Sequence, residues 1–331
     1  MQDKCAKNQD RVVVKVKINI KREALIALIF IFLYFMVPYA ATMISTGVVP
    51  VNVSDEVISG RRVVVEYKNA QKCVEVNKFI IMVLAKMYED GKEAEYWKAL
   101  AVMLRTDIFR SMGDNLSVKS SELGMEFMTK SDMKREWGSS FDTRYNLLAD
   151  CVASVNPYVI KFKDNLIEAQ FTGISCGKTL DGAKLLGENY GYLKSVECPK
   201  DLESANFVSV NTFSYADFIK KIKKEYSEAG LSEDTLMQDI QMVSKTEEGY
   251  ILKMQVGNVI LSGEKFAGIM GLQSNCMQIE DVDGKIRITT KGKGSGFGVS
   301  LYSAALMAKE GKSFEDILKN FYDGIAIVAC E

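Results

Sequence analysis

Hydrophobic residues along this chain follow two spacings, that of helices and that of strands. Glu75–Asp90 and Glu93–Met112 each carry an apolar stripe at helical spacing and end at a glycine, which predicts two helices. Four further amphipathic runs predict helices at Ser131–Trp137, Ser214–Glu228, Leu301–Lys309 and Phe314–Tyr322. Ser214 and Ser313 stand where N-caps belong, because each has an aspartate three residues later.

Short β-prone runs are interspersed with these helices. They lie at Arg61–Tyr67, Tyr158–Phe162, Leu166–Thr172 and Ile286–Thr290. Between the second and third of these runs, Lys163-Asp164-Asn165 is a turn signal. We find no repeat and no second linker, so the part beyond residue 60 is predicted to be one mixed α+β domain.

No charged residue occurs between Ala24 and Ser54. The first part of this run, ALIALIFIFLYFMVPYAATMI, is long enough to cross a hydrocarbon core, which takes roughly 20 residues. The expected organisation is a basic cytoplasmic tail at 1–23, a transmembrane signal anchor at 24–46, a linker at 47–60 and an extracytoplasmic domain at 61–331. The basic tail sets this orientation. A cleaved signal peptide is the alternative, but the long leader and the lack of a clean A-x-A site favour the anchor.

The composition excludes several kinds of chemistry. A net charge of −1 gives no reason to expect nucleic acid as a partner. The chain has no histidine, which removes Ser-His-Asp and Cys-His nucleophile systems and the commonest zinc ligand. Its 7 cysteines show no C-x-x-C spacing, so neither a metal nor another cofactor is expected. Six cysteines follow the predicted anchor, and both disulfides and buried free thiols stay open for them.

Four segments carry a resemblance to a known family. They are FIIMVLAKMYEDGKEAEYWKALAVMLRT (79–106), EAQFTGISCGKT (168–179) with YLKSVECPKD (192–201), SGEKFAGIMGLQS (262–274) and GKGSGFGVSLYSAALMAKEGKSFEDILKNFY (292–322). In this order, after a hydrophobic anchor, they resemble the family of stage II sporulation protein D and the LytB amidase enhancers. The resemblance covers most of Val63–Ile327, so it implies a domain of that family's fold.

Members of that family cut the glycan strands of peptidoglycan as lytic transglycosylases. The reaction needs a carboxylic acid that protonates the glycosidic oxygen. At the position of the family's glutamate this chain has Lys86, and a lysine with a pKa of about 10.4 is a poor proton donor here. Glu89, one helical turn further on, and Glu95, at the start of the next helix, are the candidate replacements. For Glu89, a solvated helix-end carboxylate is the favoured interpretation.

The resemblance also indicates candidate glycan-binding residues: Arg105, Lys178, Gly296, Phe297 and Tyr302. Arg105 either pairs with a carboxylate inside the fold, which is favoured, or faces an acidic peptide stem. The glycines at 292–298 either let a glycan approach the backbone or form a tight turn.

Further departures from the family concern histidine and cysteine. Thr172 and Phe297 replace family histidines, so a metal ion held through them is not expected. Cys176 and Cys198 fall where some relatives carry a cysteine pair, which makes Cys176–Cys198 the first choice for a disulfide, with free thiols as the alternative.

The expected function is that of a membrane-anchored sporulation protein that binds peptidoglycan. The resemblance implies that it works during engulfment and stimulates a partner amidase similar to stage II sporulation protein P, with glycan cleavage lost or weakened. Two alternatives stay open. One is an active lytic transglycosylase with a relocated carboxylate; the other is a non-enzymatic surface scaffold that binds only proteins.

Overall fold

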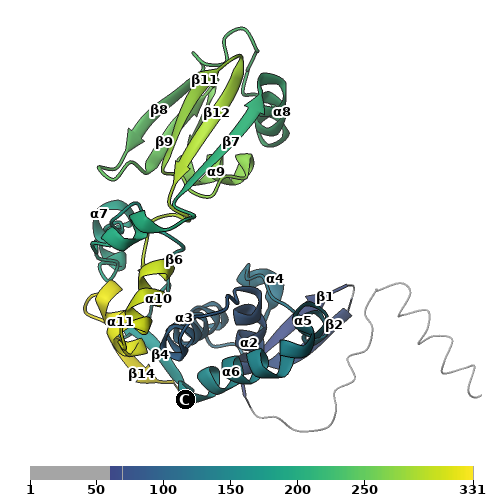
Figure 1. Cartoon of the computed structure of the whole chain (residues 1–331), viewed down its shortest axis with the longest axis vertical. Helices are drawn as coiled ribbons and strands as arrows, with labels where there is room; N and C mark the ends of the chain where they lie inside the picture. Colours follow the sequence, from purple (N-terminus) through teal and green to yellow (C-terminus); the bar gives the residue numbers. More distant parts are fainter. Residues whose placement is uncertain (1–59, 69, 331) are drawn as a thin grey trace, which may run out of the picture. The chain divides into compact units, whose positions relative to one another are not determined.

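The structure is a computed structural model that describes residues 60–68 and 70–330 (Figure 1). Within these two ranges, no helix is both long enough and apolar enough to cross a membrane. The predicted tail at 1–23, the predicted anchor at 24–46 and nearly all of the linker lie outside the described residues.

The first half of the described chain is mainly helical and is built around α3 (Ala94–Met112). This helix contacts α2 (Val76–Lys86), α6 (Phe141–Ser154) and, from much later in the chain, α11 (Phe314–Phe321). Because neighbours cover several of its faces, α3 is apolar well beyond a single stripe. Trp97 lies in this core, with 0% of its surface exposed.

The remaining elements of this half are short. They are β1 (Arg62–Tyr67), β2 (Ala70–Glu75), β3 (Ser117–Lys119), α4 (Ser120–Leu123), α5 (Lys130–Trp137) and the 3₁₀ turn η1 (Gly138–Ser140). β1 pairs in parallel with β3, with Arg62 opposite Ser117. Thr129 caps α5 through a complete capping box with Asp132.

The middle of the chain returns to α3 through small strands. β4 (Tyr158–Phe162) pairs with β5 (Asn165–Leu166) across Lys163 and Asp164, whose positive φ angles of 49° and 66° make the predicted turn. On its other side, β4 pairs with β14 (Ala326–Ala329).

Further short elements follow β5. They are β6 (Phe171–Thr172), α7 (Gly182–Leu186), η2 (Glu188–Tyr190), η3 (Pro199–Glu203), β13 (Val299–Ser300) and α10 (Leu301–Lys309). β6 pairs in parallel with β13, which brings residue 171 beside residue 299. The buried carboxylate of Asp201 accepts hydrogen bonds of 2.6 Å from the Ser300 and Ser303 hydroxyls and so ties η3 to the start of α10.

Residues 208–291 form a β-rich part with a hydrophobic core of its own. It contains β7 (Val208–Ser214), α8 (Tyr215–Glu225), β8 (Ile240–Lys245), β9 (Ile251–Val256), β10 (Val259–Ser262), α9 (Gly263–Met270), β11 (Met277–Val282) and β12 (Lys285–Lys291). The strands form two antiparallel sheets, in the orders β11-β12-β7 and β10-β9-β8 (Figure 1). Phe218 of α8, Phe266 of α9 and Ile288 of β12 belong to one hydrophobic core, to which both sheets and both helices contribute.

Mixed helices and strands confirm the predicted α+β class, and most predicted elements lie within a few residues of the observed ones. Ser214 and Ser313 cap α8 and α11 as predicted. The expected strand at Leu166–Thr172 is wrong in its middle part, which is not a strand. Its backbone bonds to side chains from α3 and from later residues. Single backbone bonds also join Ile167 to Ile160 of β4 and Gln170 to Val299 of β13, and they do not form a continuous ladder.

Candidate functional site

Lys86, Glu89 and Glu95, the three candidates for the acid, do not form a catalytic arrangement with one another. Lys86 is the last residue of α2, about half exposed, and its Nζ is 3.7 Å from the carboxylate of Glu126. Glu89 lies in the loop after α2, with 70% of its side chain exposed, and its carboxylate is 3.2 Å from Lys92. The carboxylates of Glu126 and Glu89 are therefore both solvated and each lies near a lysine. For Glu89, this is the environment that the sequence favoured.

Glu95 holds helices together. Its carboxylate is 2.7 Å from Lys98 Nζ and accepts a 2.8 Å hydrogen bond from the Phe314 backbone N–H, at the start of α11. Partial burial alone would raise the pKa of this carboxyl, but the bonds from Lys98 and Phe314 lower it overall. A carboxyl that is ionised in this way is poorly suited to donate a proton at neutral pH.

Arg105 lies inside the fold, with 1% of its surface exposed. Its guanidinium donates hydrogen bonds to the carbonyls of Val152, Val155 and Tyr158 and to the side chain of Asn77, so it joins the end of α6 to β4. Burial lowers its pKa to about 10. Among these partners are main-chain carbonyls and an amide, where the sequence predicted a carboxylate, and the role is structural.

The other glycan-binding candidates have different surroundings. Lys178 is 3.2 Å from Glu197 on the surface. Tyr302 is half-buried at the start of α10, and its backbone N–H bonds to Gly173. Gly296 is buried with a φ of +88°, and a Cβ there would lie 2.5 Å from the Tyr250 ring, so this glycine serves a tight turn.

The predicted Cys176–Cys198 disulfide is not formed in the structure, where both residues are free thiols. The Cys198 thiol bonds at 3.5 Å to the carbonyl of Val196, and the Cys176 thiol bonds at 3.4 Å to that of Lys291. The two side chains are therefore directed to different partners. Among residues 60–68 and 70–330, no three Cys, Asp or Glu side chains form a group that could hold a metal ion.

A cavity of about 400 Å³ opens where α3, α7 and α9 meet residues 168–171 and 295–297. It is lined by Asp107, Glu168, Ala169, Gln170, Phe171, Leu186, Glu264, Ser295 and Phe297. Phe297 is the candidate from the sequence that lines it; Lys86, Glu89 and Glu95 do not. Two phenyl rings together with carboxyl, amide and hydroxyl groups give this cavity both apolar and hydrogen-bonding surfaces.

Asp107 is the unusual titratable group of this cavity. It projects from α3, with 21% of its side chain exposed, and its Oδ1 accepts a 2.8 Å hydrogen bond from the Ala169 N–H. Burial raises the pKa of its carboxyl to about 6, helped by the charge of Glu168 and opposed by the Ala169 bond and the Arg110 guanidinium. Asp107 can therefore gain or lose a proton close to neutral pH.

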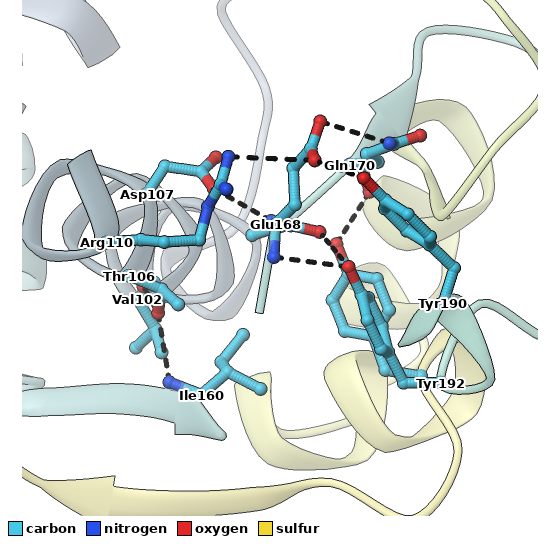
Figure 2. Close-up of polar contacts among 11 residues, drawn as sticks. Val102, Thr106, Asp107, Arg110, Ile160, Glu168, Gln170, Tyr190 and Tyr192 are labelled. Carbon is cyan, nitrogen blue, oxygen red and sulfur yellow. Dashed lines mark hydrogen bonds and ion pairs between the residues drawn. The ribbon is translucent and has the colours of Figure 1, made fainter. Parts of the chain in front are cut away.

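Glu168 faces Asp107 across Arg110, as Figure 2 shows. Arg110 lies 4.0 Å from the Asp107 carboxylate and 3.6 Å from that of Glu168. The Glu168 carboxylate also accepts hydrogen bonds of 3.1 Å from the Tyr190 hydroxyl and from the Gln170 amide. Two acidic groups are thus held on one wall of the cavity by a shared cation.

Buried tyrosines fix the backbone of this wall. The Tyr192 hydroxyl donates a 3.0 Å hydrogen bond to the Glu168 carbonyl, and the buried Tyr322 hydroxyl donates a 2.6 Å bond to the Gln170 carbonyl. Because buried Tyr hydroxyls need partners, these bonds stabilise residues 168–170, together with the backbone bond that the Val299 N–H donates to the Gln170 carbonyl.

Sequence reasoning missed Asp107 and used Glu168 only as part of a resembling segment. A signal for Asp107 was present, since it is a carboxyl that follows the apolar run from Ala99 to Leu104 on a helix predicted to be buried. Nothing in the sequence shows that residues 107 and 168 meet. Their approach depends on the return of the chain to α3 after β5.

These features define a mixed α+β protein with an open cavity whose lining is both polar and apolar. The chain is 30% identical over 277 residues to the stage II sporulation protein D of Bacillus amyloliquefaciens, and 29% identical over 272 residues to that of Bacillus subtilis strain 168. Each alignment covers 79% of this chain and 77% of the relative. No protein-family model matches the chain. The chain belongs to the stage II sporulation protein D family, which confirms the resemblance of its four segments.

Proposed function

We propose that this protein is a sporulation protein of the cell wall that binds the glycan strands of peptidoglycan in the cavity beside Asp107. The observation that carries this proposal is the lining of the cavity, where Phe171 and Phe297 lie among carboxyl, amide and hydroxyl groups. A sugar has apolar ring faces and a rim of hydroxyls, and a site of this composition matches both. Family membership supports the cell-wall setting.

The position that resembles the family's catalytic glutamate supports weakened cleavage. Lys86 is an amine, and its Nζ lies 3.7 Å from the carboxylate of Glu126, so the side chain at this position is not a carboxylic acid. The predicted anchor at 24–46 would hold the cavity outside the membrane, within reach of the wall. We include in the proposal the stimulation of a partner amidase, a role that needs bound glycan rather than an acid at residue 86.

Binding is tested with the full-length chain, purified in a mild detergent and sedimented with isolated sacculi. Phe171→Ala and Phe297→Ala are each expected to weaken co-sedimentation about five- to tenfold, since one aromatic contact contributes about 1 kcal/mol. Tyr158→Ala is the matched control, because Tyr158 is 38% exposed, like Phe171 at 37%, and does not line the cavity. Equal losses in all three variants, or no binding by the wild type, would contradict the proposal. Amidase stimulation without glycan binding would instead favour a protein-binding scaffold.

A second candidate function is lytic cleavage with Asp107 as the acid. It is favoured by the pKa of Asp107, which burial raises to about 6, and by the second carboxyl of Glu168 in the same cavity. Sacculi incubated with the wild type would then release anhydro-muropeptides. Release is expected to fall at least a hundredfold in Asp107→Asn and to persist in the control Glu89→Gln. Wild-type protein that binds sacculi and releases no such products would leave binding as the function.

A further inference from the structure

Three segments far apart in the sequence cross beside the cavity. The glycine-rich segment at 291–297 lies between residues 172–176 and residues 273–276 and bonds to both. On one side, the Lys293 N–H donates to the Ile174 carbonyl at 2.7 Å; on the other, the Gly294 N–H donates to the Gln273 carbonyl at 2.8 Å. Gly296 and Phe297 then turn back toward the cavity.

Each of the two outer segments contributes one thiol to this crossing. The Cys176 Sγ donates to the Lys291 carbonyl at 3.4 Å, and the Lys291 N–H donates to the Cys276 carbonyl at 2.8 Å, so both cysteines flank one residue. Cys176 and Cys276 also pack against the same small apolar cluster around Leu180 and Tyr250. The Tyr250 hydroxyl accepts a 3.0 Å bond from the Cys176 N–H, which fixes that residue's backbone.

We infer that Cys176 and Cys276 form a disulfide when the protein meets an oxidising disulfide, in place of the Cys176–Cys198 bond expected from the sequence. Cys198 lies near by, since its N–H donates to the Gly177 carbonyl at 2.8 Å. The thiols of Cys176 and Cys276, however, lie in one apolar cluster, and that cluster does not include Cys198.

The two thiols divide the exchange reaction between them. Cys176 is half-exposed, so its sulfur, after losing a proton to solvent, attacks the disulfide RSSR and displaces one RS⁻. Cys276 is buried, so it reacts second: once the mixed disulfide has formed at Cys176, the Cys276 thiol loses its proton and becomes a thiolate. That thiolate attacks the Cys176 sulfur and displaces the second RS⁻. The two protons end on the two RS⁻ groups, so two cysteine thiols and RSSR give one protein disulfide and two RSH.

This bond would join the two segments on either side of the glycine-rich segment, which carries Ser295 and Phe297. Because the bond closes a loop of about one hundred residues, it removes much conformational freedom from the unfolded chain. Oxidation is therefore expected to raise the midpoint of thermal unfolding by about 5 °C.

The test uses the full-length chain in a mild detergent, incubated with oxidised glutathione, alkylated and digested with trypsin. Cleavage at lysines places Cys176 in residues 164–178, Cys198 in residues 195–200 and Cys276 in residues 266–285, so each pairing gives a linked peptide of distinct mass. The expected product links 164–178 to 266–285 and disappears on reduction. Cys276→Ser should lose both this peptide and the gain in unfolding temperature, while Cys198→Ser should keep both.

A linked peptide of 164–178 with 195–200 would overturn the inference in favour of the Cys176–Cys198 bond. Complete alkylation of Cys176 and Cys276 after oxidation would overturn it as well. If Cys276→Ser fails to fold, Cys276→Ala and the peptide map of the wild type decide the question alone. None of these outcomes depends on whether the protein binds glycan.

Discussion

Substituting Asp107 by asparagine should make the protein more stable at neutral pH. Burial raises the pKa of this carboxyl from its ordinary value of 3.8 to about 6, so the folded protein binds the proton more tightly than the unfolded chain. The carboxyl therefore contributes stability that is fully present below pH 3.8 and is lost as the pH rises through about 6. Asparagine resembles the protonated form and keeps an oxygen for the Ala169 N–H.

The magnitude follows from the size of the shift. A difference of about two pH units corresponds to about 3 kcal/mol at most, and the 21% exposure of the side chain leaves the carboxyl largely desolvated. Above about pH 7 the Asp107→Asn variant should exceed the wild type in free energy of unfolding by about 2–3 kcal/mol. Near pH 4 the two proteins should differ by less than about 0.5 kcal/mol.

Urea unfolding of the full-length chain, followed by tryptophan fluorescence at several pH values, measures this difference. Both tryptophans report on the helical part, since Trp97 is fully buried and Trp137 is 7% exposed. Asp114→Asn, at an exposed position just after α3, is the control and should change stability little at any pH. A pH-independent difference between Asp107→Asn and the wild type would refute the assignment of a buried, proton-binding carboxyl at this position.

Three further substitutions test the structural roles. Arg105→Met should lower the free energy of unfolding by about 3–5 kcal/mol, because it leaves buried carbonyls without a hydrogen-bond donor. A urea midpoint within error of the wild type would show that the guanidinium does not bond to these carbonyls. Gly296→Ala should lower the free energy of unfolding by more than about 2 kcal/mol, because its Cβ collides with the buried Tyr250 ring. Gly284→Ala, with φ +71° and open space around it, should lower it by about 1 kcal/mol. Equal losses measured by calorimetry would contradict the tight turn at Gly296. Glu95→Gln should cost about 1 kcal/mol in urea unfolding by weakening the start of α11, and a cost no larger than that of Glu89→Gln would argue against this contact.

Local order was readable from the sequence because it depends on near neighbours. The two helices before residue 113, the cap at Ser313 and the turn at Lys163 each arise from side chains a few residues apart. α6 was missed because its apolar positions, such as Leu148 and Cys151, are separated by charged and polar residues that face solvent. Its stability depends on α2 and α3, which the local pattern does not show.

The cavity was beyond reach for a related reason. It is assembled from α3, the segment after β5, α7, α9 and the glycine-rich segment, and their meeting is a property of the tertiary fold. The resemblance directed attention to residues that match the family, and it thereby favoured positions such as Arg105, whose role is structural. Phe297 was the exception, because the same residue both departs from the family's histidine and lines the cavity.

Three consecutive residues of α3 show how the fold and the site are connected. Arg105 bonds to the carbonyl ends of α6, and the Thr106 hydroxyl donates to the Val102 carbonyl and accepts a 2.9 Å bond from the Ile160 N–H of β4 (Figure 2). Asp107 then binds the Ala169 N–H on the cavity wall. Arg105 and Thr106 match the family, so the resemblance in this segment is explained by the support of β4 and α6. The next residue, which the resemblance does not include, carries the carboxyl that lines the cavity, so Asp107 is the position at which the proposed cleavage is tested.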